Sequence, residues 1–454
     1  MGNPHVLVIP FPAQGHIIPL LELSRHLVNH GFKITFVNTE YNHDRIMNAI
    51  GVKDKIGDQI HMVTIPDGIE TLEDRKKPGK SSAAVLNFMP GKLEELIDRI
   101  SGSNGEEITC VLADQSIGWA LEIAEKKGIR RAAFCPAAAA LLVLVFNIPN
   151  LIRDGIIADD GTPLKKQTIR LSPEMPAVNT EKLLWVSPGN LPMQKNIFEL
   201  VVRNIKSVKV AEWLLCNSTY DLEPAAFTLA KNILPIGPLL ASNQLRDSVG
   251  NFWTEDATCL NWLDRQPPHS VIYVAFGSFT IFDPTQFQEL ALGLELCNRP
   301  FLWVVRPDTT DGTNDAYPKG FHDRVGTRGQ MVGSVAQQKI LSHPSVACFL
   351  SHCGWNSTIE GVSNGIPFLC WPYFADQFLN QNYICDVWKV GLGLDRDESG
   401  IIRRGEIKTK VEQLLGDETL KVRALDLKKL VMASIKEGGA SDNNLKNFIE
   451  WMKA

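Results

Sequence analysis

The amino-acid sequence predicts an α/β protein with two Rossmann-like domains, each built on a doubly wound, mainly parallel sheet. A strand–loop–helix opening occurs in each half, and apolar strand-like runs alternate with amphipathic helical stretches. The length of 454 residues is also too great for one compact core. Because open parallel sheets bind ligands beyond the carboxyl ends of their strands, we expect the two domains to face each other across a cleft that holds the site.

The first domain is predicted over residues 1–240. It opens with HVLVIPFPAQGHIIPLLELSRHLVNHG at 5–31, which indicates an apolar strand, a loop with proline and glycine, and an amphipathic helix that Gly31 ends. Three later segments repeat the pattern: KITFVNT at 33–39, ITCVLADQSIGWALEIAEKKG at 108–128 and RRAAFCP at 130–136. Strands that alternate with helices of about 10 to 15 residues predict βαβ units.

The second domain is predicted over residues 259–436. Its opening strand and loop are SVIYVAFGSFT at 270–280, and a helical stretch over 284–297 follows them. Later apolar runs predict further strands: PFLWVVRP at 300–307, VACFLSH at 346–352, IPFLCWPY at 366–373 and VGLGLD at 390–395. The same alternation therefore predicts a second parallel sheet.

Three segments connect or extend these domains. The polar stretch 241–258 has the composition of an interdomain linker. The loop-rich stretch 154–189 is either a functional lid or wall or a simple surface excursion. The ending at 437–454 predicts a short amphipathic helix that packs back on the N-terminal domain.

The composition is that of an ordinary globular protein, with 44% hydrophobic and 21% charged residues. A net charge of −5 without a long basic run argues against a nucleic-acid partner. The longest apolar run, 132–146, is interrupted by Pro136 and is shorter than the roughly 20 residues of a membrane span. No secretory signal is recognisable at the start. Nine cysteines without a CxxC pair favour free thiols over zinc, so we expect a cytoplasmic protein.

Residues 351–360, SHCGWNSTIE, lie where a predicted strand passes into a helix. The first N–H groups of a helix lack partners within it and lie at the positive end of its dipole. Such a helix start binds phosphate, and Gly354 allows close approach. Three side chains here can donate to phosphate oxygens: His352, Asn356 and Ser357. The alternative is a capping box of Ser357 and Glu360, because S-x-x-E is a common helix start.

Several other motifs are incomplete. No GxGxxG follows either leading strand, which weakens a nicotinamide or flavin interpretation without excluding it. The segment GKSS at 79–82 lacks the earlier glycine of a Walker loop. Asp395 and Asp397 resemble the acidic pair of metal-dependent sugar transferases, but they lie in a charged run typical of a solvated loop. His26 and His30 lack the glutamate of HExxH, so no metal site is predicted.

The segment from Ser334 to Gln377 reads SVAQQKILSHPSVACFLSHCGWNSTIEGVSNGIPFLCWPYFADQ and strongly resembles the signature box of plant secondary-product UDP-glycosyltransferases. Further segments resemble the family in family order: PFPAQGH, IPDGI, VLADQSIGWALEIAEKKGI, LLCNSTYDLE, PIGPL, NWLDRQPPHSVIYVAFGS and FLWVVRP. The resemblance implies the two-domain GT-B fold and inverting transfer of a sugar from UDP to a small lipophilic acceptor. The UDP-sugar is then a co-substrate, no metal is implied, and a monomer is the family default.

The resemblance also implies roles for residues of the donor site. His352, Asn356 and Ser357 are implied to hold the diphosphate together with Ser278 of the VAFGS loop. Glu360 is implied to take the ribose hydroxyls, for which a carboxylate acceptor is well suited.

The end of the box is implied to contact the sugar. Asp376 and Gln377 match the pair that bonds sugar hydroxyls, and a terminal Gln accompanies a preference for glucose. Trp355 is implied to supply a rigid wall and a backbone amide near the sugar.

The start of the box departs from the family pattern. Trp-Ala/Val-Pro-Gln is replaced here by Ser334, Val335, an alanine and Gln337, so the Trp that stacks on uracil is missing. Loss of such a stack costs about 1–3 kcal/mol, which corresponds to UDP-sugar binding that is about tenfold to hundredfold weaker. Natural drift, an engineered substitution and a changed nucleobase preference all remain open.

The catalytic pair is implied in the first domain. His16 ends the loop PFPAQGH, where the family places its general base, and Asp114 ends a neighbouring predicted strand. A carboxylate bonded to one imidazole nitrogen fixes the tautomer and stabilises the imidazolium. The alternative for His16 is a residue that only caps or packs the helix start.

Two other functions stay open beside the transferase. One is a weakly active UDP-sugar-binding protein, because of Ser334, and the other is a nicotinamide oxidoreductase on the same alternation of strands and helices. Phe146 and Trp185 are proposed to line the acceptor pocket, whose ligand class the sequence leaves undefined.

Overall fold

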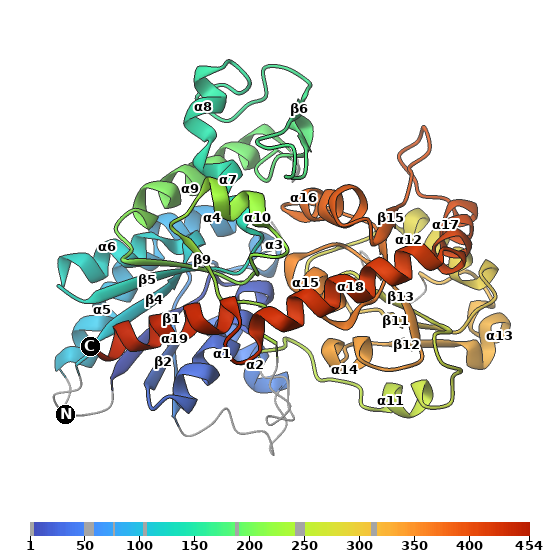
Figure 1. Cartoon of the computed structure of the whole chain (residues 1–454), viewed down its shortest axis with the longest axis horizontal. Coiled ribbons are helices and arrows are strands. Elements are labelled where there is room, and N and C mark those ends of the chain that lie inside the picture. Colours follow the sequence, from blue (N-terminus) through green and yellow to red (C-terminus); the bar gives the residue numbers. More distant parts are fainter. Residues whose placement is uncertain are drawn as a thin grey trace. The chain divides into compact units, whose positions relative to one another are not determined.

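The structure is a computed structural model that describes residues 4–49, 59–75, 78–102, 107–186, 190–240, 250–309 and 316–454 (Figure 1). The chain forms two compact units. The N-terminal unit comprises Met1–Phe252, Phe374–Asp376 and Ala433–Ala454, and the C-terminal unit comprises Trp253–Tyr373 and Gln377–Met432. Of the linker predicted at 241–258, residues 241–249 lie outside the described residues.

The N-terminal unit contains a seven-stranded parallel sheet in the order β3-β2-β1-β4-β5-β8-β9. All five residues of β1 and of β4 are buried, as expected for central strands with both faces covered. The strands are β1 His5–Ile9, β2 Lys33–Thr39, β3 Ile60–Ile65, β4 Cys110–Asp114, β5 Arg130–Cys135, β8 Trp213–Cys216 and β9 Ile233–Pro235.

Helices connect these strands. In the first of them, buried residues recur at helical spacing, including Ile17, Leu20, Leu21 and Leu27, and Gly31 follows its end with a φ of +88°. The helices are α1 Gln14–Asn29, α2 Glu40–Ala49, α3 Leu72–Arg75, α4 Pro78–Asn87, α5 Met89–Gly102, α6 Trp119–Lys126, α7 Ala139–Phe146, α8 Ile148–Arg153, α9 Leu191–Val208, α10 Pro224–Leu229 and α19 Ala440–Lys453, with short turns η1 Gln115–Ile117 and η2 Thr180–Lys182.

The strand order of the N-terminal sheet reverses beside β1. The chain runs outward through β2 and β3 and then returns to place β4 on the other side of β1. The carboxyl ends of β1 and β4 therefore flank the switch point, where doubly wound sheets bind their ligands.

The C-terminal unit contains a six-stranded parallel sheet in the order β12-β11-β10-β13-β14-β15. The switch point of this sheet lies between β10 and β13. The strands are β10 Val271–Ala275, β11 Phe301–Val304, β12 Gly329–Val332, β13 Val346–Ser351, β14 Phe368–Cys370 and β15 Gly391–Gly393. The helices are α11 Thr258–Leu263, α12 Pro284–Leu296, α13 Phe321–Val325, α14 Gln337–Leu341, α15 Trp355–Asn364, α16 Gln377–Asn382, α17 Arg404–Gly416 and α18 Glu418–Ile435, with short elements η3 Gly326–Arg328 and η4 Tyr383–Val387.

An excursion leaves the N-terminal unit after α8. It carries a small antiparallel pair, β6 Thr168–Ile169 with β7 Val178–Asn179, and Figure 1 shows it in teal and green beyond α7 and α9. Trp185 anchors the excursion, because its side chain is fully buried and its Nε1 donates to the Gly161 carbonyl at 2.8 Å.

The last helix, α19 (red in Figure 1), contacts β9 of the N-terminal sheet. Asn444 Nδ2 donates to the Pro235 carbonyl at 2.8 Å, and the rings of Phe448 and Trp213 lie 5.5 Å apart. Among the described residues, no helix combines the length and apolar character needed to cross a membrane.

Candidate functional site

The structure brings His16 and Asp114 together at the switch point of the N-terminal sheet. His16 lies in the first turn of α1 just after β1, and Asp114 is the last residue of β4. The His16 Nδ1 and Asp114 Oδ2 atoms are 2.7 Å apart, although the residues are 98 positions apart in the chain. Asp114 is fully buried, whereas 29% of the His16 side chain is exposed. The Asp114 carboxylate accepts a second bond from the Ser116 N–H at 2.8 Å.

This pairing changes the protonation of the histidine. Burial alone would lower the pKa of His16, but the charge and hydrogen bond of Asp114 and the charge of Asp376 outweigh it, so the pKa lies above the ordinary 6.5. With Nδ1–H donating to the carboxylate, Nε2 is the nitrogen that can take a proton. The ring of Phe11 packs against the imidazole, with 5.0 Å between ring centroids.

The predicted phosphate site is built at the start of α15. The helix begins at Trp355 with Gly354 as its N-cap, and no side chain caps it. Ser357 therefore lies inside the helix and cannot be its N-cap, which rules out the capping box of Ser357 and Glu360. The first N–H groups of a helix have no carbonyl partner within the helix, which is why a helix start of this kind suits an anion.

His352 lies against the same helix start. A Cβ atom at Gly354 or at Gly277 would come within 2.5 Å of its Nε2, so both glycines are needed for this packing. Burial, and then the charge of Arg306, lower the pKa of His352 to about 4. The imidazole is therefore neutral at physiological pH, and it would meet a phosphate as a hydrogen-bond donor rather than as a cation. Ser278 is partly exposed in the loop that follows Gly277.

Gln337 connects the remaining predicted donor residues. Its Nε2 donates to Ser357 Oγ at 2.8 Å and to Glu360 Oε2 at 2.7 Å, while its Oε1 accepts from the Tyr273 hydroxyl at 3.0 Å. Gln338 Nε2 holds the other carboxylate oxygen of Glu360 at 3.1 Å. The carboxylate predicted to bind ribose is thus oriented in advance by two amides.

The departure from the family pattern lies beside this network. Ser334 is partly exposed, and its backbone carbonyl accepts a bond from the Asp256 N–H at 2.9 Å. Val335 is buried, with 8% exposed. The backbone at residue 334, where the family has its aromatic residue, is therefore fixed by a hydrogen bond that does not depend on the serine side chain.

Two predicted sugar contacts have buried side chains. Trp355 is 3% exposed and packs towards Trp388, with 6.3 Å between ring centroids. The role of Trp355 as a rigid wall and backbone donor near the sugar stays a prediction. Gln377 is 4% exposed, and its Oε1 accepts from the Tyr373 N–H at 2.7 Å. Asp376 is partly exposed, and Asn356 lies in the first turn of α15.

The two predicted acceptor residues differ in their surroundings. Phe146 is partly exposed at the end of α7, a helix whose other residues are all buried. Trp185 is fully buried against Phe198, with 5.2 Å between ring centroids. The prediction that Trp185 lines an acceptor pocket is therefore corrected: its indole fills the core of the excursion and does not face a ligand.

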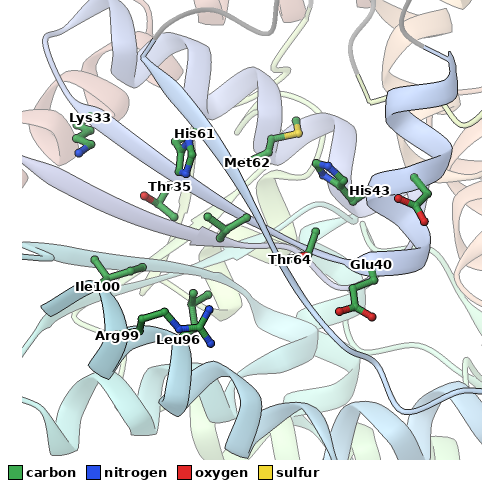
Figure 2. A pocket seen from close by; sticks show the side chains of 12 residues that line it. Lys33, Thr35, Glu40, His43, His61, Met62, Thr64, Leu96, Arg99 and Ile100 are labelled. Atoms are coloured by element: carbon green, nitrogen blue, oxygen red, sulfur yellow. The ribbon is translucent and has the colours of Figure 1, made fainter. Parts of the chain in front are cut away.

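No metal site is evident in the part of the chain that the structure describes, because no three His, Cys, Asp or Glu side chains gather there. Asp395 and Asp397 lie in an exposed turn, where Asp397 Oδ1 accepts from the Ser399 and Ile401 N–H groups, each at 2.9 Å. A hollow of about 540 Å³ opens between α2, α5 and the β2–β3 edge, where Figure 2 shows His61 and Thr35 on the strands and Arg99 on α5. None of the predicted site residues lines it.

Several residues around the site were not predicted from the sequence. Phe11 belongs to the quoted PFPAQGH loop, so its place two residues after β1 is the signal that could have found it. Tyr273 and Arg306 come from apolar strand segments that give no such signal, because the partner of Tyr273 lies on α14 and that of Arg306 in a loop.

The fold and the site together define a two-domain α/β transferase that takes a nucleotide-linked donor. The family model described as UDP-glucoronosyl and UDP-glucosyl transferase matches residues 205–432. UDP-glycosyltransferase 83A1 from Arabidopsis thaliana is 52% identical over 100% of this chain and 98% of its own length. Linamarin synthase 1 from Manihot esculenta is 33% identical over 98% of this chain and 96% of its own length. The chain belongs to the plant UDP-glycosyltransferase family.

Solved structures agree with this assignment. Os79 from O. sativa in complex with UDP is 28% identical, with a TM-score of 0.82 over 98% of this chain and 100% of its own. A UDP-glucosyltransferase from Polygonum tinctorium is 26% identical, with a TM-score of 0.84 over 100% of this chain and 99% of its own. The predicted GT-B fold is confirmed, and the protein is a UDP-glycosyltransferase whose donor is a UDP-sugar. Neither the inactive binder nor the oxidoreductase is favoured by these findings.

Proposed function

We propose that this enzyme transfers glucose from UDP-glucose to a hydroxyl of a small lipophilic metabolite, with inversion, to give a β-glucoside. The observation that carries the proposal is the 2.7 Å bond between His16 Nδ1 and the buried Asp114 carboxylate. A carboxylate-bonded imidazole with a free second nitrogen suits removal of a hydroxyl proton. The start of α15 and the neutral His352 supply hydrogen-bond donors for the diphosphate.

The reaction follows from these groups. His16 Nε2 takes the proton of the acceptor hydroxyl while Asp114 stabilises the resulting imidazolium. The acceptor oxygen forms a bond to the anomeric carbon from the face opposite UDP, and the bond from that carbon to the β-phosphate oxygen breaks. The electron pair of the broken bond leaves with UDP, whose growing charge is met by donors at the start of α15.

Glucose and a lipophilic acceptor are the finer part of the proposal. Glucose is supported by Gln377 at the end of the box and by relatives whose names specify glucosyl transfer, such as 7-deoxyloganetin glucosyltransferase from Catharanthus roseus, 31% identical. A lipophilic acceptor is supported by Phe11 against His16 and by the apolar helix that ends at Phe146.

A donor-by-acceptor panel tests the proposal. Purified enzyme would be mixed with UDP-glucose, UDP-galactose or UDP-glucuronate and with flavonol, terpenoid and phenolic-acid acceptors, followed by chromatography and NMR of the product. A β-glucoside formed fastest from UDP-glucose is expected. An α-linked product would overturn the inverting mechanism, and a faster reaction with another donor would overturn the glucose assignment.

We also place the enzyme in the cytoplasm as a monomer. The location is supported by nine cysteines that all remain free thiols, as a reducing compartment favours. The monomer follows the family resemblance, and sedimentation of the purified protein tests it.

The acid limb of the pH profile should report His16. Because its pKa is raised above 6.5 and the base must be neutral, kcat/KM should fall as the pH drops through that raised value and level off above it. Transfer rates measured at acceptor concentrations well below KM, from about pH 5 to about pH 9 in steps of about half a pH unit, check this. A profile without an acid limb would show that another group acts as the base.

Replacing Ser334 with tryptophan should strengthen donor binding. Restoring a stacking surface is worth about 1–3 kcal/mol, so the Kd for UDP should fall about tenfold to hundredfold by calorimetry. The backbone bond from Asp256 to residue 334 does not involve the serine side chain, so the substitution should leave it intact. Ser334→Ala is the matched control, and inorganic diphosphate, which has no base, should bind both variants equally. An unchanged Kd for UDP would mean that the uracil ring of UDP does not lie against residue 334.

A further inference from the structure

Arg306 is a buried cation behind the loop that carries Ser278. It lies two residues after the end of β11 and is 6% exposed. Its Nη2 donates to the Thr280 carbonyl at 2.8 Å, and its Nη1 donates to the Gly277 carbonyl. Both ends of the loop at 277–280 are therefore fixed by one guanidinium.

The surroundings of Arg306 keep its charge close to the donor site. Its Nε donates to Asp308 Oδ1 at 3.0 Å, but 48% of the Asp308 side chain is exposed, so water screens this ion pair. The guanidinium also lies over the Trp253 ring, 5.4 Å from its centroid. Arginine stays charged even where it is buried, so the positive charge persists behind the loop.

The loop, the guanidinium and His352 form one packed group. Gly277, whose carbonyl Arg306 holds, has a φ of +65° and leaves no room for a Cβ beside His352 Nε2. The charge of Arg306 also favours the neutral form of His352. A substitution at residue 306 should therefore alter both predicted diphosphate contacts, the position of Ser278 and the protonation of His352.

We propose that Arg306 is a positioning residue for the donor diphosphate. It pulls the carbonyls of the 277–280 loop towards itself, which presents Ser278 and the loop N–H groups to the phosphates, and its charge stabilises UDP as it leaves. The inference rests on the proposed function. It concerns the bond from the anomeric carbon to the β-phosphate oxygen, whose electron pair stays on that oxygen when UDP departs.

Variants at residue 306 separate fixation from charge. Arg306→Met should weaken UDP binding and lower kcat, each by about 10- to 100-fold. Arg306→Lys keeps the charge but cannot donate to both carbonyls. Compared with Arg306→Met, it should therefore restore UDP affinity more fully than kcat. Guanidinium ion should partly rescue Arg306→Ala, and ethylammonium should rescue it less. Arg324→Met, at an exposed arginine paired with Glu295, is the matched control and should change neither value.

Two further readouts do not depend on a large structural change. The NMR-detected pKa of His352 should rise in Arg306→Met, because a nearby positive charge is gone. Asp308→Asn keeps Arg306 and removes its screened partner, so UDP should bind about twofold tighter at low salt. Wild-type UDP affinity and kcat in Arg306→Met, or an unchanged Kd in Asp308→Asn, would overturn the proposal. Calorimetry with UDP needs no turnover, so failure of the glucosyl-transfer assignment would be seen separately, as wild-type enzyme that binds UDP without forming product.

Discussion

Replacing His16 with alanine is expected to lower kcat for sugar transfer by about 100- to 10,000-fold, because the acceptor proton then has no base. The Kd for UDP should stay near the wild-type value, because the predicted diphosphate contacts lie in the C-terminal unit. The His16 side chain is partly exposed in the first turn of α1, so its loss should not unfold the protein. Stopped-time assays at saturating UDP-glucose and calorimetry with UDP measure the two quantities.

A histidine that directly follows the same helix provides the control. His30 is exposed at the end of α1, where its Nδ1 bonds the His26 carbonyl at 2.8 Å, so His30→Ala should retain wild-type kcat. Wild-type turnover in His16→Ala would show that the base has been assigned to the wrong residue. Loss of UDP binding in the same variant would point to a structural role instead.

Replacing Asp114 with asparagine is expected to lower kcat by about 100- to 1,000-fold through the wrong tautomer of His16. The asparagine oxygen can still accept from the Ser116 N–H, which places its NH₂ group against His16 Nδ1. His16 Nδ1 must then accept a hydrogen bond from this NH₂ group, so the ring proton of the neutral imidazole moves to Nε2. With a proton on Nε2, His16 has no lone pair there to take the proton of the acceptor hydroxyl. The charge that raises the pKa of His16 is also lost, so the acid limb of the residual activity should move to lower pH.

Asp98→Asn serves as the control, because Asp98 is 63% exposed in an ion pair with Lys127 and lies away from the site. Its rate and pH profile should match the wild type. If Asp114→Asn retained full activity with an unshifted profile, the pair seen in the structure would be a packing feature only.

The fold was predictable because its signals are local. Apolar runs of strand length, amphipathic stretches and glycine ends recur along the chain, and the structure places parallel sheets where these patterns occur. The passage from strand to helix on which the predicted phosphate site rests could also be read from the sequence, since a strand, a glycine and a helix follow one another within SHCGWNSTIE. The choice between phosphate site and capping box was not, because it depends on which residue begins the helix.

Residues whose partners lie on distant elements were predicted less well. Trp185 belongs to the 154–189 excursion and was proposed to line the acceptor pocket, but its environment is set by Phe198 on α9 and by Gly161. Arg306 was missed because its role depends on the Gly277 and Thr280 carbonyls of a loop 29 and 26 residues earlier in the chain.

The family, the two parallel sheets and the loops that carry His16, Asp114 and the predicted phosphate site could all be inferred from the sequence alone. Each of these follows from residues adjacent in the chain, where spacing and side-chain chemistry fix the local structure. Only the tertiary structure decided that His16 and Asp114 share a hydrogen bond, that Gln337 orients Glu360, and that Trp185 is core. Those facts depend on which strands and helices lie side by side, since packing and burial, rather than sequence neighbours, set the contacts of a side chain.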